Sequence, residues 1–94
     1  MKEVPNLWFV YIIQTQCDKL YTGITTDIQR RFQEHLDVYQ GANSKGAKFF
    51  RGHKPKKVIY CEEFLDRSSA SKREHQIKSL SAQKKRILIS NIEV

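Results

Sequence analysis

The chain has 94 residues, with 17 lysines and arginines against 10 aspartates and glutamates, so its net charge at pH 7 is +7. A chain of this length is expected to form one domain, residues 1–94, around a single small core. Its longest apolar run, residues 7–13, is far shorter than the ~20 residues that cross a bilayer, and its first five residues have no signal-peptide pattern. We therefore expect a soluble, cytoplasmic domain without membrane attachment.

The two cysteines, Cys17 and Cys61, form no evident metal or disulfide motif. Neither has a second cysteine or a histidine within four residues, whereas a structural zinc site needs four clustered ligands. In a chain without an export signal, the simplest expectation is that both thiols are reduced.

Positive charge is concentrated in the second half of the chain. Residues 1–44 have a net charge of −1 and residues 45–94 carry +8. Such clusters are most often solvated surface. A pI near 9.6 in so small a domain favours instead a face that binds nucleic acid, because lysines and arginines placed against phosphates release counterions. The clusters are Lys45, Lys48, Arg51, Lys54, Lys56 and Lys57, then Lys72, Arg73, Lys78, Lys84, Lys85 and Arg86.

The first third of the chain predicts a β-hairpin followed by a helix. Residues 7–13 are apolar on both faces, as in a central strand, and a polar turn separates them from a second short strand, residues 20–24. Thr26 with Gln29 forms a capping box, which predicts a helix to about Leu36. Ile28, Phe32 and Leu36 make the apolar stripe of that helix.

The rest of the chain predicts a basic loop, a third strand and two helices. No periodicity is visible from Tyr39 to Pro55, and a strand is expected over residues 58–64. Asp66 or Ser68 caps a helix that carries Ala70, Ile77 and Leu80, and the last helix, residues 82–90, adds Ile87 and Leu88, with Ile92 beyond it. The order β-β-α-β-α-α predicts an α/β fold of the α+β type, a small and mostly antiparallel three-stranded sheet flanked by helices.

Four polar residues and a glycine stand at suggestive spacing. Tyr11 and Tyr21 lie on paired strands, Gly23 follows two residues later, and Arg31 and His35 project from one face of the first helix. Each has an ordinary explanation, since strand tyrosines usually pack, helix arginines are usually solvated and a strand glycine can mark a bulge or strand end. Together they can converge on one pocket.

These segments resemble a known family. Phe9-Val10-Tyr11 followed by Tyr21-Thr22-Gly23 is similar to the paired signature of the GIY-YIG nuclease family. Residues 27–35 resemble its Arg-xxx-His segment, residues 46–52 resemble a loop of its small stand-alone bacterial members, and residues 70–74 resemble its glutamate-bearing helix. The resemblance covers about residues 7–88. Phe9 replaces a signature glycine, and the asparagine that many members place after the glutamate has no clear match.

The resemblance implies a role for each matching residue. Tyr11 and Tyr21 correspond to the signature tyrosines, Arg31 to the catalytic arginine and His35 to a histidine present in part of the family. Glu74 corresponds to the carboxylate that holds one divalent ion, Mg²⁺ or Mn²⁺. The implied activity is endonucleolytic hydrolysis of DNA, in repair or recombination.

The chemistry of phosphodiester hydrolysis suits these groups. A phenol accepts a proton from water only as phenolate, and a nearby arginine or metal ion lowers its pKa from an ordinary value near ~10. Arg31 and a bound ion can stabilise the charge of the transition state. Mg²⁺ usually takes one or two carboxylates and keeps several waters, so Glu74 can suffice. The structural alternative is a surface ion pair of Glu74 with Lys78, and which tyrosine is the base stays open.

The basic loop is the expected contact with substrate. We expect Lys45, Lys48 and Arg51 to position the phosphate backbone of DNA, with RNA as an alternative, strandedness open and a monomer favoured. Two other functions remain in view. One is a nucleic-acid-binding module of the same fold with weak or no catalysis, and the other is an interaction domain whose basic surface meets an acidic protein.

Overall fold

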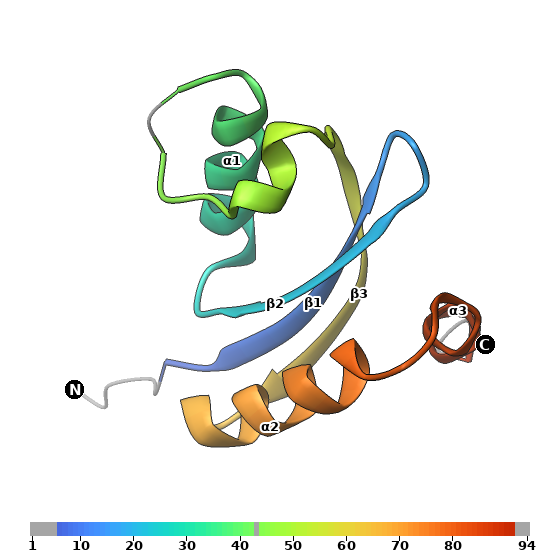
Figure 1. Cartoon of the computed structure of the whole chain (residues 1–94). Coiled ribbons are helices and arrows are strands. Elements are labelled where there is room, and N and C mark those ends of the chain that lie inside the picture. Colours follow the sequence, from blue (N-terminus) through green and yellow to red (C-terminus); the bar gives the residue numbers. More distant parts are fainter. Residues whose placement is uncertain (1–5, 43, 92–94) are drawn as a thin grey trace.

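A computed structural model describes residues 6–42 and 44–91 of the chain (Figure 1). The expected order of strands and helices is confirmed, and the fold is of the α+β type. The elements are β1 (Trp8–Thr15), β2 (Leu20–Thr25), α1 (Ile28–Tyr39), a 3-10 helix η1 (Lys48–Arg51), β3 (Pro55–Phe64), α2 (Arg67–Lys78) and α3 (Ala82–Ser90).

The sheet is antiparallel, with the order β2-β1-β3. β1 is therefore the central strand, as its run of apolar residues predicts, and both of its faces are covered. In Figure 1, α1 and η1 lie on one side of the sheet, and α2 lies on the other with α3 beyond it. The register pairs Tyr11 with Gly23 of β2 and with Cys61 of β3.

Alternate residues of β1 enter two separate apolar clusters. Val10 and Ile12 pack with Ala70 and Ile77 of α2. Tyr11 and Ile13 point to the other face, towards α1 and η1. This alternation follows from the two-residue period of a strand. It places Tyr11 in the smaller cluster, under α1.

The first helix differs from the expectation in its cap and in its buried residue. Thr26 is not the cap: the side chain of Asp27 accepts a hydrogen bond from the Arg30 backbone N–H at 3.0 Å. The helix also continues past Leu36 to Tyr39, and its one fully buried side chain is His35. The side chain that α1 buries completely is thus His35, and not Leu36 of the predicted apolar stripe.

The loop and the third strand also differ from the expectation. The expected loop contains η1, because Phe50 is buried and holds one helical turn against α1. β3 begins at Pro55, earlier than expected, since its first residues pair with the end of β1.

Ile87 is 52% exposed and does not join the core, whereas Leu88 does. Asp66, not Ser68, caps α2 by accepting from the Ser69 N–H, and Ile92 lies outside the described residues.

Among residues 6–42 and 44–91, no helix combines the length and the apolar character needed to traverse a bilayer.

Candidate active site

Tyr11 and His35 form a buried pair at the centre of the smaller cluster. The Tyr11 hydroxyl lies 2.8 Å from Nε2 of His35, and the two residues are 2% and 0% exposed. β1 supplies the tyrosine and α1 supplies the histidine, 24 residues apart in the sequence. The expected convergence of these two side chains is present in the fold.

The other nitrogen of His35 decides the direction of this hydrogen bond. The backbone N–H of Ala47 donates to Nδ1 at 3.0 Å. A neutral imidazole carries one proton, so Nδ1 as acceptor leaves that proton on Nε2. His35 therefore donates to the Tyr11 oxygen and stabilises negative charge there.

The pKa of His35 agrees with this arrangement. Burial, reinforced by the positive charge of Arg31, lowers the pKa of His35 to about 4, so the imidazole is neutral at physiological pH. Burial also raises the pKa of Tyr11, and Tyr21 adds to that effect. Arg31 acts in the opposite direction and favours the phenolate. The resting site thus holds a neutral phenol that accepts a hydrogen bond from a neutral imidazole.

Gly23 makes room for the Tyr11 ring. A Cβ atom at position 23 would lie 2.5 Å from the Tyr11 hydroxyl oxygen and 2.7 Å from Cζ. Gly23 lies inside β2, opposite Tyr11 across the strand pair. The glycine thus neither marks a bulge nor ends the strand, because its missing side chain lets the phenol lie across β2 towards α1.

Arg31 is held beside this pair by two acceptors. Its Nη1 donates to the backbone carbonyl of Lys45 at 2.8 Å and to Oε1 of Glu34 at 3.0 Å. Its side chain is only partly exposed, and its charge acts on both Tyr11 and His35. A guanidinium tethered in this way is a preorganised partner for developing negative charge.

Tyr21 closes the cluster from β2. Its ring meets the rings of His35 and Phe50 edge-on, with centroids 5.3 Å and 4.9 Å away, and it contacts Phe49 and Tyr11 at 5.4 Å and 6.3 Å. Tyr21 is only partly buried. The two signature tyrosines therefore lie side by side in different environments, one enclosed and one nearer the surface.

Glu74 lies on α2, which covers the face of the sheet opposite the cluster (Figure 1). Burial is the main cause that raises the pKa of Tyr11, and the charge of Glu74 adds to it. The carboxylate therefore acts on the phenol through space. Its Oε2 also lies 3.3 Å from Nζ of Lys78, so the surface ion pair expected as the structural alternative is formed.

The carboxylate of Glu74 has the oxygen ligand chemistry that a hard cation prefers. Within the described ranges, no three histidine, cysteine, aspartate or glutamate side chains gather as a metal cluster. A partly buried single carboxylate is what Mg²⁺ uses when most of its ligands are waters and substrate phosphate oxygens.

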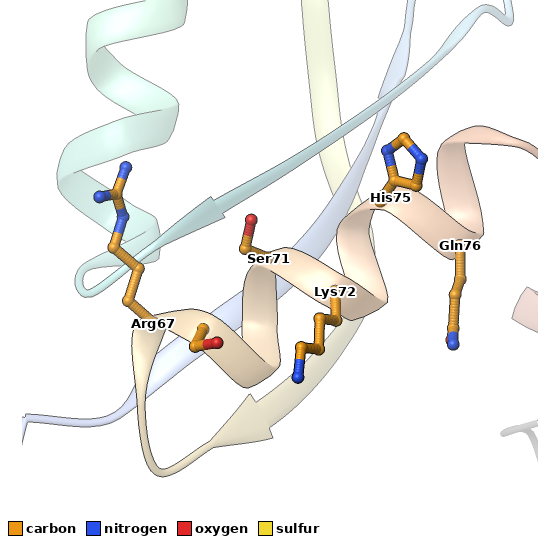
Figure 2. Close-up of a pocket in the computed structure, with 6 residues that line it drawn as sticks. Arg67, Ser71, Lys72, His75 and Gln76 are labelled. Carbon is orange, nitrogen blue, oxygen red and sulfur yellow. The ribbon is translucent and has the colours of Figure 1, made fainter.

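The face of α2 beside Glu74 is rich in donors. A broad hollow of about 800 Å³ runs along this helix and is lined by Arg67, Ser68, Ser71, Lys72, His75 and Gln76 (Figure 2). None of these residues is acidic. Figure 2 shows Arg67, Ser71 and His75 projecting from one side of α2, and Lys72 and Gln76 from the other. The hollow is a surface suited to phosphates.

The three candidate residues of the basic loop do not line one hollow. Lys48 and Arg51 of η1 line a second hollow of about 480 Å³, at the end of α1. Lys45 is not in its lining, and its backbone carbonyl instead holds Arg31. Lys45 thus contributes to the site through its main chain as well as carrying a charge.

Gly46, Ala47 and Phe50 lie in the loop that resembles the family, but the sequence predicted no role for them at the site, where they orient His35. A Cβ at position 46 would meet Cα of His35 at 2.8 Å, so only glycine lets the loop lie against α1. The next N–H then reaches Nδ1 of His35, and the Phe50 ring packs on the imidazole at 4.4 Å. The signals in the sequence were the glycine within an otherwise basic loop and the resemblance of residues 46–52 to a loop of the family.

Residues 7–87 match the model of a protein family described as the GIY-YIG catalytic domain. The chain belongs to this family, whose fold is that of nucleases acting on nucleic acid, and the expected resemblance is confirmed.

Within the family, the chain is similar to small proteins called UPF0213. It is 48% identical over 86 residues to a UPF0213 protein of Desulfotalea psychrophila, covering 92% of this chain and 74% of that protein. It is 40% identical over 83 residues to the UPF0213 protein YhbQ of Escherichia coli, covering 88% and 77%. The solution NMR structure of a UPF0213 protein from Bacillus halodurans has a TM-score of 0.56 and 35% identity, covering 92% of this chain and 85% of that one.

Proposed function

We propose that this protein is a divalent-metal-dependent endonuclease that hydrolyses phosphodiester bonds in DNA. One observation carries the proposal: the Tyr11 oxygen accepts a hydrogen bond from neutral His35, with the tethered Arg31 beside it. A tyrosine that only packs needs no arrangement that stabilises its phenolate.

Tyr11 is the base in this mechanism. The phenol first releases its own proton to solvent. As phenolate it accepts a proton from water while the water oxygen attacks phosphorus, the bond to the leaving 3′ or 5′ oxygen breaks, and that oxygen takes a proton from solvent. His35 holds the phenolate through Nε2–H and does not itself take up the proton. Arg31 stabilises the charge that gathers on the phosphate oxygens. Tyr21, nearer the surface, positions the substrate.

Glu74 is the residue that would hold one Mg²⁺ or Mn²⁺ ion. The ion would supply charge neutralisation at the scissile phosphate and would favour deprotonation of the nearby phenol. The donors along α2 and the two basic side chains of η1 would hold the phosphates on either side.

A second function, binding nucleic acid with weak or no catalysis, is favoured by one contact. Lys78 pairs with the Glu74 carboxylate, and this pair must open before the carboxylate can meet a cation. Helix pairs four residues apart contribute only ~0.3–0.5 kcal/mol, so a divalent ion competes with Lys78 easily. Catalysis therefore remains the main proposal.

The test is Glu74→Gln, with Glu63→Gln as the matched control. Glu63 is exposed on β3 and loses the same charge. Labelled single-stranded, duplex and branched DNA and an RNA strand are incubated with each protein in Mg²⁺, Mn²⁺ or EDTA. We expect Glu74→Gln to abolish cleavage, to bind DNA in EDTA as well as the wild type does and to melt at a similar temperature, while Glu63→Gln cleaves normally. Wild-type cleavage by Glu74→Gln would overturn the assignment of the metal ligand.

A further inference from the structure

A third hollow lies beside the candidate active site and is used by none of the steps above. It measures about 310 Å³ and lies where the turn between β1 and β2, the helix η1 and the start of α3 meet. Its apolar wall is formed by Phe49 and Leu20, and its charged rim by Lys19, Lys85 and Arg86, with Asp18. We call it the Phe49 pocket.

The aromatic wall connects this pocket to the catalytic cluster. The ring of Phe49 stacks on His53, with centroids 4.4 Å apart and planes 20° from parallel. It also lies 5.4 Å from the ring of Tyr21. The residue before it, Lys48, and Arg51 line the hollow at the end of α1, while Phe50 is buried. A ligand against Phe49 is therefore one aromatic ring away from Tyr21.

The rim keeps an excess of positive charge. Arg86 pairs with Asp18, donating to its carboxylate at 3.2 Å and to its backbone carbonyl at 3.0 Å. This contact joins α3 to the turn between β1 and β2 and neutralises the one acidic residue of the rim. Neither Lys19 nor Lys85 forms an ion pair with any described residue. Burial, with the nearby charge of Lys78, lowers the pKa of Lys85, so an anion here would relieve an unfavourable environment.

An aromatic wall combined with free cations matches the chemistry of one nucleotide. Proteins that hold single strands stack bases on aromatic rings and place lysines along the phosphates. A paired base inside a duplex cannot offer its face to a protein ring, because its neighbours already cover that face. The volume is at the lower end of the range for ligand pockets, which suits a single base better than a longer ligand.

We propose that the Phe49 pocket binds one unstacked nucleobase of the substrate, with its phosphate held by Lys19 and Lys85. This inference rests on the proposed function and adds a substrate requirement: the strand must be unpaired, or must become so, at a nucleotide close to the scissile phosphate. The site therefore favours single-stranded or locally unpaired nucleic acid over a regular duplex.

The first experiment uses the unmodified protein in EDTA, so that no cleavage occurs. Binding is measured by fluorescence anisotropy for a short single strand, the same strand made abasic, and the corresponding duplex. Phosphate attraction alone favours the duplex, whose charge density is higher. We expect instead that the single strand binds about tenfold more tightly than the abasic strand and more tightly than the duplex.

The second experiment compares Phe49→Leu, Lys85→Gln and the control Phe64→Leu, which makes the same change in the other apolar cluster. Phe49→Leu should weaken binding of the intact strand about tenfold, leave binding of the abasic strand unchanged and keep the salt slope. Lys85→Gln should instead reduce the slope by up to ~0.7. Phe64→Leu should bind both strands like the wild type.

The outcomes separate the two proposals. Equal binding of intact and abasic strands, or no binding of either, overturns the pocket even if the protein cleaves DNA in Mg²⁺. The expected binding differences without cleavage in any metal overturn the proposed enzyme and leave the pocket in place. If Phe49→Leu fails to fold, as judged by its melting curve, the comparison of strands with the wild-type protein decides alone.

Discussion

Replacement of Gly23 by alanine should destabilise the protein and separate Tyr11 from His35. In a strand interior, alanine is ordinarily the better residue by ~0.5–1 kcal/mol. Here its Cβ would meet the Tyr11 hydroxyl oxygen at 2.5 Å and Cζ at 2.7 Å, and the enclosed ring has little room to retreat. Overpacking of this kind costs ~1–3 kcal/mol, and the lost hydrogen bond costs ~1 kcal/mol more. The net expectation is a loss of about 1–3 kcal/mol, opposite in sign to the strand preference.

Gly52 provides the matched control. A Cβ at this position meets nothing within 4 Å, and its φ of −116° is open to any residue. Gly52→Ala should therefore be neutral or stabilise by up to ~1 kcal/mol. Urea denaturation followed by circular dichroism gives the free energies, and ¹⁵N NMR of the His35 imidazole reports its hydrogen bonds. If Gly23→Ala is as stable as Gly52→Ala and still cleaves DNA, the close approach of Tyr11 has no functional importance.

Three further predictions concern protonation and charge. Burial and a neighbouring guanidinium lower the pKa of His35 to about 4, so below pH ~6.5 the unfolded chain binds a proton that the folded chain does not. The free energy of unfolding should therefore fall by about 2 kcal/mol between pH 7 and pH 5, and the same fall in a His35→Gln protein would contradict this. The Thr15 hydroxyl and the His53 imidazole donate hydrogen bonds to the Cys17 sulfur and lower the pKa of Cys17 to about 7, while burial raises the pKa of Cys61. Iodoacetamide should therefore alkylate Cys17 first at pH 7, and equal rates by mass spectrometry would refute the assignment. Replacing both Lys48 and Arg51 with glutamine should reduce the dependence of the logarithm of the duplex binding constant on the logarithm of salt concentration by up to ~0.9 per lost phosphate contact. An unchanged slope would show that these two side chains are solvated and contact no phosphate.

Local patterns in the sequence were sufficient for the architecture. An apolar run with no polar face predicts a central strand, and β1 is indeed covered on both sides. Turn residues and helix periodicity gave the order of elements because hydrophobic spacing reports local structure directly. The match of signature residues also identified the family, and Arg31 and His35 share one face of α1 as their spacing requires.

Boundaries depended on contacts that the local pattern does not contain. Thr26 and Asp27 are both good caps, and only the fold shows that the Asp27 carboxylate accepts from the Arg30 N–H. η1 exists because Phe50 finds a buried place against α1 and Tyr11. Ile87 looks like a core residue by type, yet α3 contributes Leu88 instead.

The chemistry of the site was decided by tertiary structure. The sequence places a histidine near a tyrosine but is silent about which nitrogen carries the proton. That proton lies on Nε2 because a loop twelve residues away brings the Ala47 N–H to Nδ1, and the loop can do so because Gly46 lies against the backbone of α1. Likewise, Gly23 is required because the Tyr11 ring, from another strand, occupies the space that a side chain at position 23 would take. Hydrogen-bond direction and close approach depend on atoms that only folding brings together, so the residue types are readable from the sequence and these contacts are not.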